Sequence, residues 1–295
     1  MSVSTEILRV LINGLTNGMM LFLISAGLTL IFGVLNVINI AHGSFYMFGA
    51  YTAYLMMSSE ITLIQYGGFW IALIISGVVV GIIGGIVERG IIKRIYDEDH
   101  IMQLLLTFSL VIVFDNFINI VFGSEFKSVT MPSLLQFQIN VLDVVVPVYN
   151  LFLVGIGVII ACILTALFRY TQYGKSIRAA AQDREMAAAL GVNIPLIYTS
   201  IFVLGSVLAG LGGALSAPYS TIHPTMGEEI IIDAFIVVVI GGLGSFTGAI
   251  IGSLLIGFLN SITFVVMPEL QSVLPFLIMS VVILIRPGGL MGVEE

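Results

Sequence analysis

Three ionisable residues lie inside long apolar runs of the sequence, where a charge is costly: His42, Asp115 and Asp233. Such groups usually face protein or water and mark transport pathways or proton relays. With the amides near them, the candidates for a pathway or a helix interface are Asn36, Asn39, His42, Asp115, Asn116 and Asp233. They either line a transport pathway or form hydrogen bonds between helices, each worth about 0.6 kcal/mol in a membrane. For His42 the alternatives are proton relay and helix capping or packing.

The sequence contains no complete catalytic or nucleotide-binding motif. Gly174-Lys175-Ser176 resembles the end of a phosphate-binding loop, but position 169 holds Arg where that loop needs Gly. The single Cys162 and three scattered histidines form no pattern typical of a metal site or a nucleophile. We therefore expect no catalytic site, metal or cofactor in this chain, and an energy source in another chain or an ion gradient.

The elements that carry these residues are membrane helices. The 295 residues are 59% hydrophobic and 9% charged, whereas globular proteins have about 25% charged residues. Eight apolar runs are each long enough to cross the hydrocarbon core. They cover residues 10–32, 41–58, 66–87, 101–122, 146–168, 196–217, 230–258 and 272–286. The sequence predicts an all-α, polytopic helix bundle of about eight spans, forming one transmembrane domain over residues 1–295.

Glycine-rich stretches interrupt two of the apolar runs, at residues 33–49 and 241–252. Irregular backbone survives at membrane depth only when it is buried in protein or lines a cavity. We expect broken or re-entrant helices at both places. Gly244, Gly248 and Gly252 repeat every four residues, a spacing that lets helices pack closely, either inside the chain or against another subunit.

The placement of basic residues predicts the orientation. Eight of the ten gather in two loops and near the C-terminus, at Arg89, Lys93, Arg94, Arg169, Lys175, Arg178, Arg184 and Arg286; Lys127 lies in the connection 123–145, and Arg9 is the misfit. By the positive-inside rule these segments are cytoplasmic, which places the connections 123–145 and 218–229 outside. Placing Arg286 on the cytoplasmic side requires one more membrane crossing. Division of the region 230–266 into two spans at residues 241–245 would supply that crossing. Simple alternation then puts the N-terminus outside.

Residues 169–195 form the one long polar stretch, with four of the ten Lys and Arg residues. Within it Glu185, Ala187 and Gly191 approximate E-A-A-x-x-x-G, the pattern with which membrane subunits of ATP-binding-cassette importers dock on their ATPases; Met186 replaces the usual Ala. We expect Ala187 and Gly191 to share the docking face of a short helix, with Gly191 turning the chain where a side chain would not fit. The candidate coupling residues are Arg178, Asp183, Arg184, Glu185, Ala187 and Gly191.

Three separated motifs resemble one family in the family's order. They are GLTLIFGVLNVINIAHGSFYMFGAY from Gly27, the loop GKSIRAAAQDREMAAALGVN, and the C-terminal GGLGSFTGAIIGSLLIG with RPGGL. They closely resemble LivH-type permeases of branched-chain amino-acid ATP-binding-cassette importers. The resemblance implies a multi-pass subunit of the bacterial inner membrane, paired with a LivM-type homologous permease, two ATP-binding subunits and a periplasmic substrate-binding protein.

The resemblance leaves the cargo open, because the external binding protein does most of the selecting. Branched-chain amino acids are the expectation, with urea, short amides and aromatic acids as alternatives carried by related systems. The implied mechanism is alternating access driven by ATP hydrolysis in the partner subunits. A stand-alone secondary transporter or channel, driven through Asp115 or Asp233, is the competing class.

Overall fold

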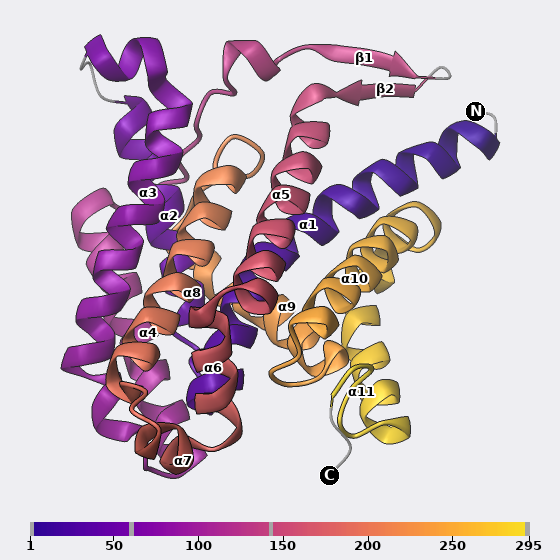
Figure 1. The fold of residues 1–295 in the computed structure, drawn as a ribbon. Coiled ribbons are helices and arrows are strands. Elements are labelled where there is room, and N and C mark those ends of the chain that lie inside the picture. Colours follow the sequence, from indigo (N-terminus) through magenta and orange to yellow (C-terminus); the bar gives the residue numbers. More distant parts are fainter. Residues whose placement is uncertain (1–2, 59–61, 142–143, 293–295) are drawn as a thin grey trace.

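The computed structural model describes residues 3–58, 62–141 and 144–292, and it is largely helical (Figure 1). Its elements are α1 (Val3–Leu35), α2 (His42–Ser58), α3 (Thr62–Gly90), η1 (Ile92–Ile95), α4 (His100–Phe122), η2 (Ser133–Leu135), β1 (Gln138–Val141), β2 (Val144–Pro147), α5 (Val148–Tyr170), α6 (Gln172–Gln182), α7 (Arg184–Ala189), α8 (Ile194–Ser216), α9 (Met226–Gly241), α10 (Phe246–Val266), η3 (Pro268–Leu270) and α11 (Leu274–Ile285).

The helical, polytopic architecture with broken segments is confirmed, and the count of about eight spans is met only loosely. Within the described residues, six helices are long and apolar enough to cross a membrane: α1, α3 from Gly68, α4, α5, α8 and α10. Three apolar helices are shorter, with 17 residues in α2, 16 in α9 and 12 in α11. The run 230–258 is divided between α9 and α10, so the expected break at 241–245 is present.

The connection after α4 contains a two-stranded sheet that the all-helical prediction missed. Strands β1 and β2 are antiparallel, with Gln138 opposite Pro147 and Val141 opposite Val144. Val144 and Val146 point inward and are buried, whereas Val145 between them is exposed. This period of two is the pattern of a half-buried strand. Figure 1 shows the hairpin at the end of the molecule opposite α6 and α7, beside the N-terminus.

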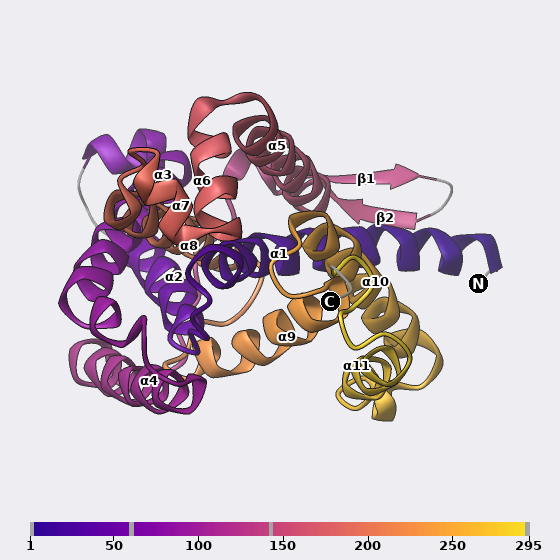
Figure 2. The ribbon, with the colours of Figure 1, turned by 60° about the horizontal axis from the view of Figure 1, so that its bottom comes forward.

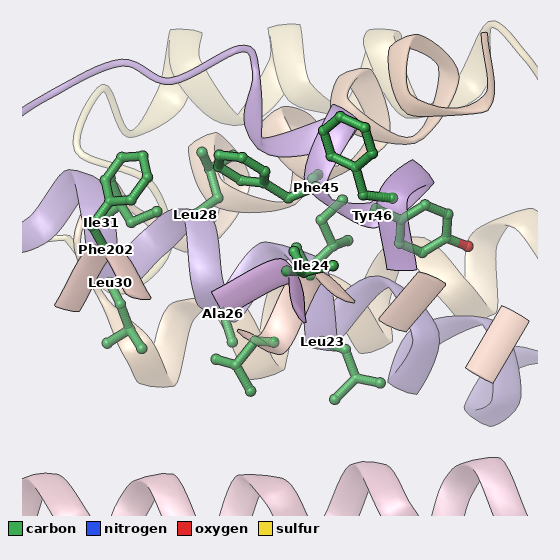
Figure 3. Close-up of a cluster of buried hydrophobic side chains, with 14 of the residues drawn as sticks. Leu23, Ile24, Ala26, Leu28, Leu30, Ile31, Phe45, Tyr46 and Phe202 are labelled. Carbon is green, nitrogen blue, oxygen red and sulfur yellow. The ribbon is translucent and has the colours of Figure 1, made fainter. Parts of the chain in front are cut away.

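The core lies where α1 passes α2 and α8. Figure 3 shows its side chains: Leu23, Ile24, Ala26, Leu28, Leu30 and Ile31 from α1, Phe45 and Tyr46 from α2, and Phe202 from α8. The rings of Phe45 and Phe202 meet edge to face, with centroids 5.9 Å apart. These three helices therefore form the framework against which the other segments are held.

Helices α2 and α9 both begin inside the molecule. A nitrogen of His42, the first residue of α2, lies 3.1 Å from the carbonyl oxygen of Ile24, eleven residues before the end of α1. At about 1.5 Å per helical residue this is roughly 16 Å from that end. The start of α9 lies at the same place, because a side chain at Gly227 would come within 2.8 Å of the Gly43 carbonyl oxygen. Segment 36–41 thus returns from the end of α1 to the middle of the fold, as expected for a broken helix.

Both basic loops lie at one end of the molecule. Arg184 in the second loop forms a salt bridge of 2.9 Å with Asp97 in the first. The C-terminal segment reaches the same end, since Met291 and Ala181 line one pocket. The expectation that the basic segments share a side is therefore confirmed, and we call this the basic end.

Candidate functional site

Three polar caps divide the stretch 169–195 into helices. The Thr171 hydroxyl accepts a hydrogen bond from the Gly174 backbone N–H at the start of α6. The carboxylate of Asp183 accepts one from Met186 N–H at 2.8 Å and starts α7. The amide oxygen of Asn193 accepts one from Leu196 N–H at 3.2 Å and starts α8. Each cap satisfies a backbone donor that the helix itself leaves free, so the short helix α7 has a defined position.

Gly191 ends α7 because of its backbone conformation. Its φ is +87°, and Val192 N–H donates to the Ala187 carbonyl while Gly191 N–H donates to the Ala188 carbonyl, each at 3.0 Å. This is a Schellman-type end, which favours glycine. A Cβ at Gly191 would meet nothing within 4 Å. The expectation that a side chain would not fit here is therefore wrong in this chain, and the left-handed φ is the reason for glycine.

The face that α7 presents to solvent differs from the expected one. Ala187 is 2% exposed and packs within its own chain, so it does not share an outer face with Gly191. The exposed apolar side chains are those of Met186 (57%) and Leu190 (77%), four residues apart. Residues at this spacing are neighbours on a helix surface. We call Met186, Leu190 and the exposed Glu185 the α7 face.

Contacts at the basic end hold α7 against the loop 91–99 and α8. Besides its salt bridge to Asp97, the Arg184 guanidinium lies 5.9 Å from the ring centre of Tyr198, and the hydrogen bond to Asp97 raises the Arg184 pKa. Tyr198 meets Tyr96 edge to face. Tyr96 in turn donates a hydrogen bond to Glu88, and burial followed by this bond raises the Tyr96 pKa.

Two of these anchors were not identified from the sequence. Glu88 is only 1% exposed and also accepts a hydrogen bond of 2.8 Å from Thr199 on α8. It sits next to Arg89 at the end of a predicted span, where a carboxylate has the appearance of an ordinary loop charge. Arg178, predicted as a coupling residue, donates to the Phe168 carbonyl and ties α6 to the end of α5.

The amides near the first break have different surroundings. Asn36 is exposed with φ +55°, and its N–H donates to the Phe32 carbonyl, so it ends α1. Asn39 is fully buried, and its amide has no hydrogen-bond partner among the described residues. His42 is also fully buried, with one ring nitrogen at the Ile24 carbonyl and the other unpartnered within the described chain. Both of these buried residues therefore leave polar atoms unpaired at the break.

The carboxylates predicted for a pathway do not form one group. Asp115 on α4 is 6% exposed and interacts electrostatically with the exposed Glu228 at the start of α9. Asp233 interacts with Glu229 on its own helix. The Asn116 side chain is exposed and donates to the Ile112 carbonyl at 2.7 Å, away from Asp115. Among the described residues, no three His, Cys, Asp or Glu side chains are grouped as metal ligands.

A cleft beside the first break is lined mainly by apolar side chains. Its volume is about 560 Å³, and it lies between α1, segment 36–41, α4 and α9. Its walls include Leu28, Phe32, Val37, Ile40, Leu104 and Phe235. Such a lining suits an aliphatic or aromatic group.

The glycines at the second break pack inside the chain. A side chain at Gly252 would come within 2.7 Å of the Val237 carbonyl oxygen, and one at Gly248 would collide with Gly241. Gly244, with φ +80°, lies against Gly33 at the end of α1. This geometry joins α9 and α10 to each other and to α1. Gly248 and Gly252 are buried in these contacts, whereas Gly244 is exposed.

Comparison with known proteins agrees with this architecture. The family model described as "branched-chain amino acid transport system / permease component" matches residues 10–283. The chain is 28% identical to the high-affinity branched-chain amino acid transport system permease protein LivH of Escherichia coli (strain K12), over 98% of the chain and 96% of that protein. BraD, the permease protein of the corresponding system in Pseudomonas aeruginosa, matches with the same identity and shares. No solved structure is significantly similar. Because the family model covers nearly the whole chain, the protein belongs to the permease-component family of branched-chain amino acid transport systems.

Proposed function

We propose that this permease subunit is driven by separate ATPase subunits that dock on the α7 face. The observation that carries the proposal is the exposed pair Met186 and Leu190, on α7 and at its C-terminal cap, with the helix anchored to the loop 91–99 and to α8. An apolar pair on a rigid helix suits insertion into a groove of a partner. Movement of the partner would then be passed to the bundle rather than absorbed by a loose loop.

The cargo we propose is a branched-chain or related apolar amino acid. Two observations support this cargo. The relatives LivH and BraD are named as permeases of branched-chain amino acid transport systems, and the cleft beside segment 36–41 has an apolar lining. A wall of this kind gains free energy when it covers an aliphatic side chain. The alternatives are urea, short amides and aromatic acids. Urea and short amides carry little apolar surface to place against this wall, so an amino acid with an aliphatic side chain is favoured over them.

The assembly we propose has a homologous LivM-type permease beside this chain, two ATP-binding subunits at the basic end and a periplasmic substrate-binding protein at the other. It would lie in the bacterial inner membrane, with the basic end in the cytoplasm. Closure of the ATPases would favour one of two states of the bundle, and transport follows because the states expose the cargo to opposite sides. The chain itself would bind no cofactor.

The test of docking is Leu190→Asp, with Leu134→Asp as its matched control. Both leucines are strongly exposed, at 77% and 69%, but Leu134 lies in η2 near the β-hairpin end. An unpaired carboxylate in an apolar contact costs several kcal/mol. We expect Leu190→Asp to lower copurification of the ATPases and uptake by about tenfold or more, and Leu134→Asp to leave ATPase copurification unchanged. Equal ATPase association and uptake in wild type and Leu190→Asp would overturn docking on the α7 face.

The competing class, a stand-alone transporter driven through Asp115 or Asp233, is tested by reconstituting the purified chain alone. We expect no uptake of leucine into proteoliposomes under a proton gradient. Uptake should require the ATPases, the second permease, the binding protein and ATP. Gradient-driven uptake by this chain alone would favour the competing class.

A further inference from the structure

The backbone of Ile38, in the irregular segment 36–41, is tied to α4. The Ile38 N–H donates to the side-chain oxygen of Gln103 at 3.3 Å. Its carbonyl oxygen lies 3.4 Å from the Thr107 hydroxyl, which also donates to the Gln103 carbonyl within α4 at 2.8 Å. Gln103 and Thr107 are four residues apart on one face of α4 and are 2% and 0% exposed. Figure 2 shows α4 at the edge of the bundle, next to α2.

The other end of the Gln103 amide holds the first basic loop. Its nitrogen donates to the carbonyl oxygens of Glu98 at 3.1 Å and Ile95 at 3.3 Å. Between these two residues lies Asp97, which forms the salt bridge to Arg184 on α7. A continuous set of polar contacts therefore runs from α7 through the loop 91–99 and Gln103 to Ile38.

We propose that Gln103 is a positioning residue that passes movement of α7 to the broken segment 36–41. The proposal rests on ATPase docking at α7. A buried amide that loses its partners is unfavourable, so a shift of the loop 91–99 favours movement of Gln103 with it. Gln103 in turn holds Ile38, so the segment at the cleft moves as well.

The segment has a reason to adopt a second arrangement. The Asn39 amide, next to Ile38, is fully buried and has no hydrogen-bond partner among the described residues. Such a group raises the free energy of this state, and an arrangement that pairs it recovers that energy. An arrangement of segment 36–41 that pairs the Asn39 amide would therefore compete with this one, and Gln103 would link the choice between them to α7.

The test is Gln103→Met in the full complex with its ATPases and binding protein. Methionine keeps the length and volume of the side chain but lacks the amide. The matched control is Gln136→Met, which removes an exposed glutamine that donates to the Met131 carbonyl in the connection after α4. The first readout is copurification of the ATPases, which measures assembly. The other three are measured per assembled complex: basal ATP hydrolysis, stimulation of ATP hydrolysis by leucine-loaded binding protein, and leucine uptake.

We expect Gln103→Met to keep copurification and basal hydrolysis but to lose stimulation and uptake by at least about fivefold, the lower range of allosteric coupling. Gln136→Met should match wild type in all four readouts. Adding Asp97→Ala to Gln103→Met should cause little further loss, because both changes interrupt one set of contacts. Additive losses, or wild-type stimulation in Gln103→Met, would overturn the proposal.

A second variant covers the case in which Gln103→Met does not assemble. Gln103→Glu has the same shape and keeps an acceptor for Ile38 N–H, but in its ionised form it cannot donate to the loop 91–99. It should assemble and lose stimulation by the same factor. If neither variant assembles, Gln103 serves folding alone and the proposal is wrong. Failure of the wild-type chain to copurify with ATPases would instead refute the proposed docking.

Discussion

At the scale of single residues, Gly191 yields a prediction that separates conformation from size. Its φ of +87° disfavours a β-carbon, although the space around it is open. Asn tolerates this region better than most residues, whereas a β-branched residue does not. We expect Gly191→Asn to keep ATPase copurification near wild type. We expect Gly191→Val to weaken it by about tenfold, in line with a cost of roughly 1–2 kcal/mol.

The control for this pair is Gly90→Val at the end of α3, which also has open space but no left-handed φ. It should assemble like wild type. If a side chain at position 191 were excluded by its size alone, Gly191→Asn and Gly191→Val would lower ATPase copurification equally. Equal loss of copurification in both variants would therefore restore the idea that a side chain does not fit there.

Chemical type was easier to predict than burial. Sequence reasoning recognised His42 and Asp115 because ionisable residues stand out in an apolar run, and the structure buries both. It did not single out Gln103 or Glu88, which lie at the ends of spans among other polar residues. Their importance comes from contacts with segments far apart in the chain, such as Ile38 and Thr199. One sequence without an alignment carries no signal for such pairs.

At the scale of elements, the packing of α1 against α10 depends on glycine. A side chain at Gly257 would bring its Cβ within 2.5 Å of the Gly18 Cα. Ser261, one turn further along α10, donates a hydrogen bond of 3.0 Å to the Val10 carbonyl and fixes the register. Overpacking of this kind typically costs about 1–3 kcal/mol. We expect Gly257→Leu to lower the thermal unfolding temperature of the purified chain in detergent by several degrees.

Gly155→Leu is the matched control, because a Cβ on this α5 glycine would meet nothing within 4 Å. Leucine favours helix over glycine, so this variant should unfold at or above the wild-type temperature. A Gly257→Leu variant as stable as Gly155→Leu would show that α1 and α10 can separate without loss. The close backbone contact would then not contribute to stability.

Periodicity located the helices but not every segment between them. Long apolar runs identified the spans, and glycine with Asn and Ser identified the breaks after α1 and α9. The hairpin of β1 and β2 was missed because four-residue strands give a weak signal beside helices of more than twenty residues. The burial of Ala187 was missed because it depends on how α7 folds back onto its own chain. Local patterns predict elements, whereas their contacts depend on the whole fold.

At the scale of the whole molecule, charge and architecture divide the chain between two ends. The basic end carries α6, α7 and the C-terminal segment, and the opposite end carries the N-terminus and the β-hairpin (Figure 1). Six long helices alone do not say which end is cytoplasmic. The positive-inside rule does, because Arg and Lys in short loops are retained on the cytoplasmic side. The orientation therefore rests on charge and needs its own test.

We predict that position 182, at the end of α6, is cytoplasmic and that position 128, in the connection after α4, faces the periplasm. Both residues, Gln182 and Ser128, are exposed. In a Cys162→Ala background, Gln182→Cys should react with a membrane-impermeant maleimide only after the cells are permeabilised, and Ser128→Cys should react in intact cells. Thr130→Cys, also exposed, is a second reporter for the outer side. Reaction of Gln182→Cys in intact cells would place α7 outside, where no ATPase could reach it, and would refute both the orientation and docking on α7.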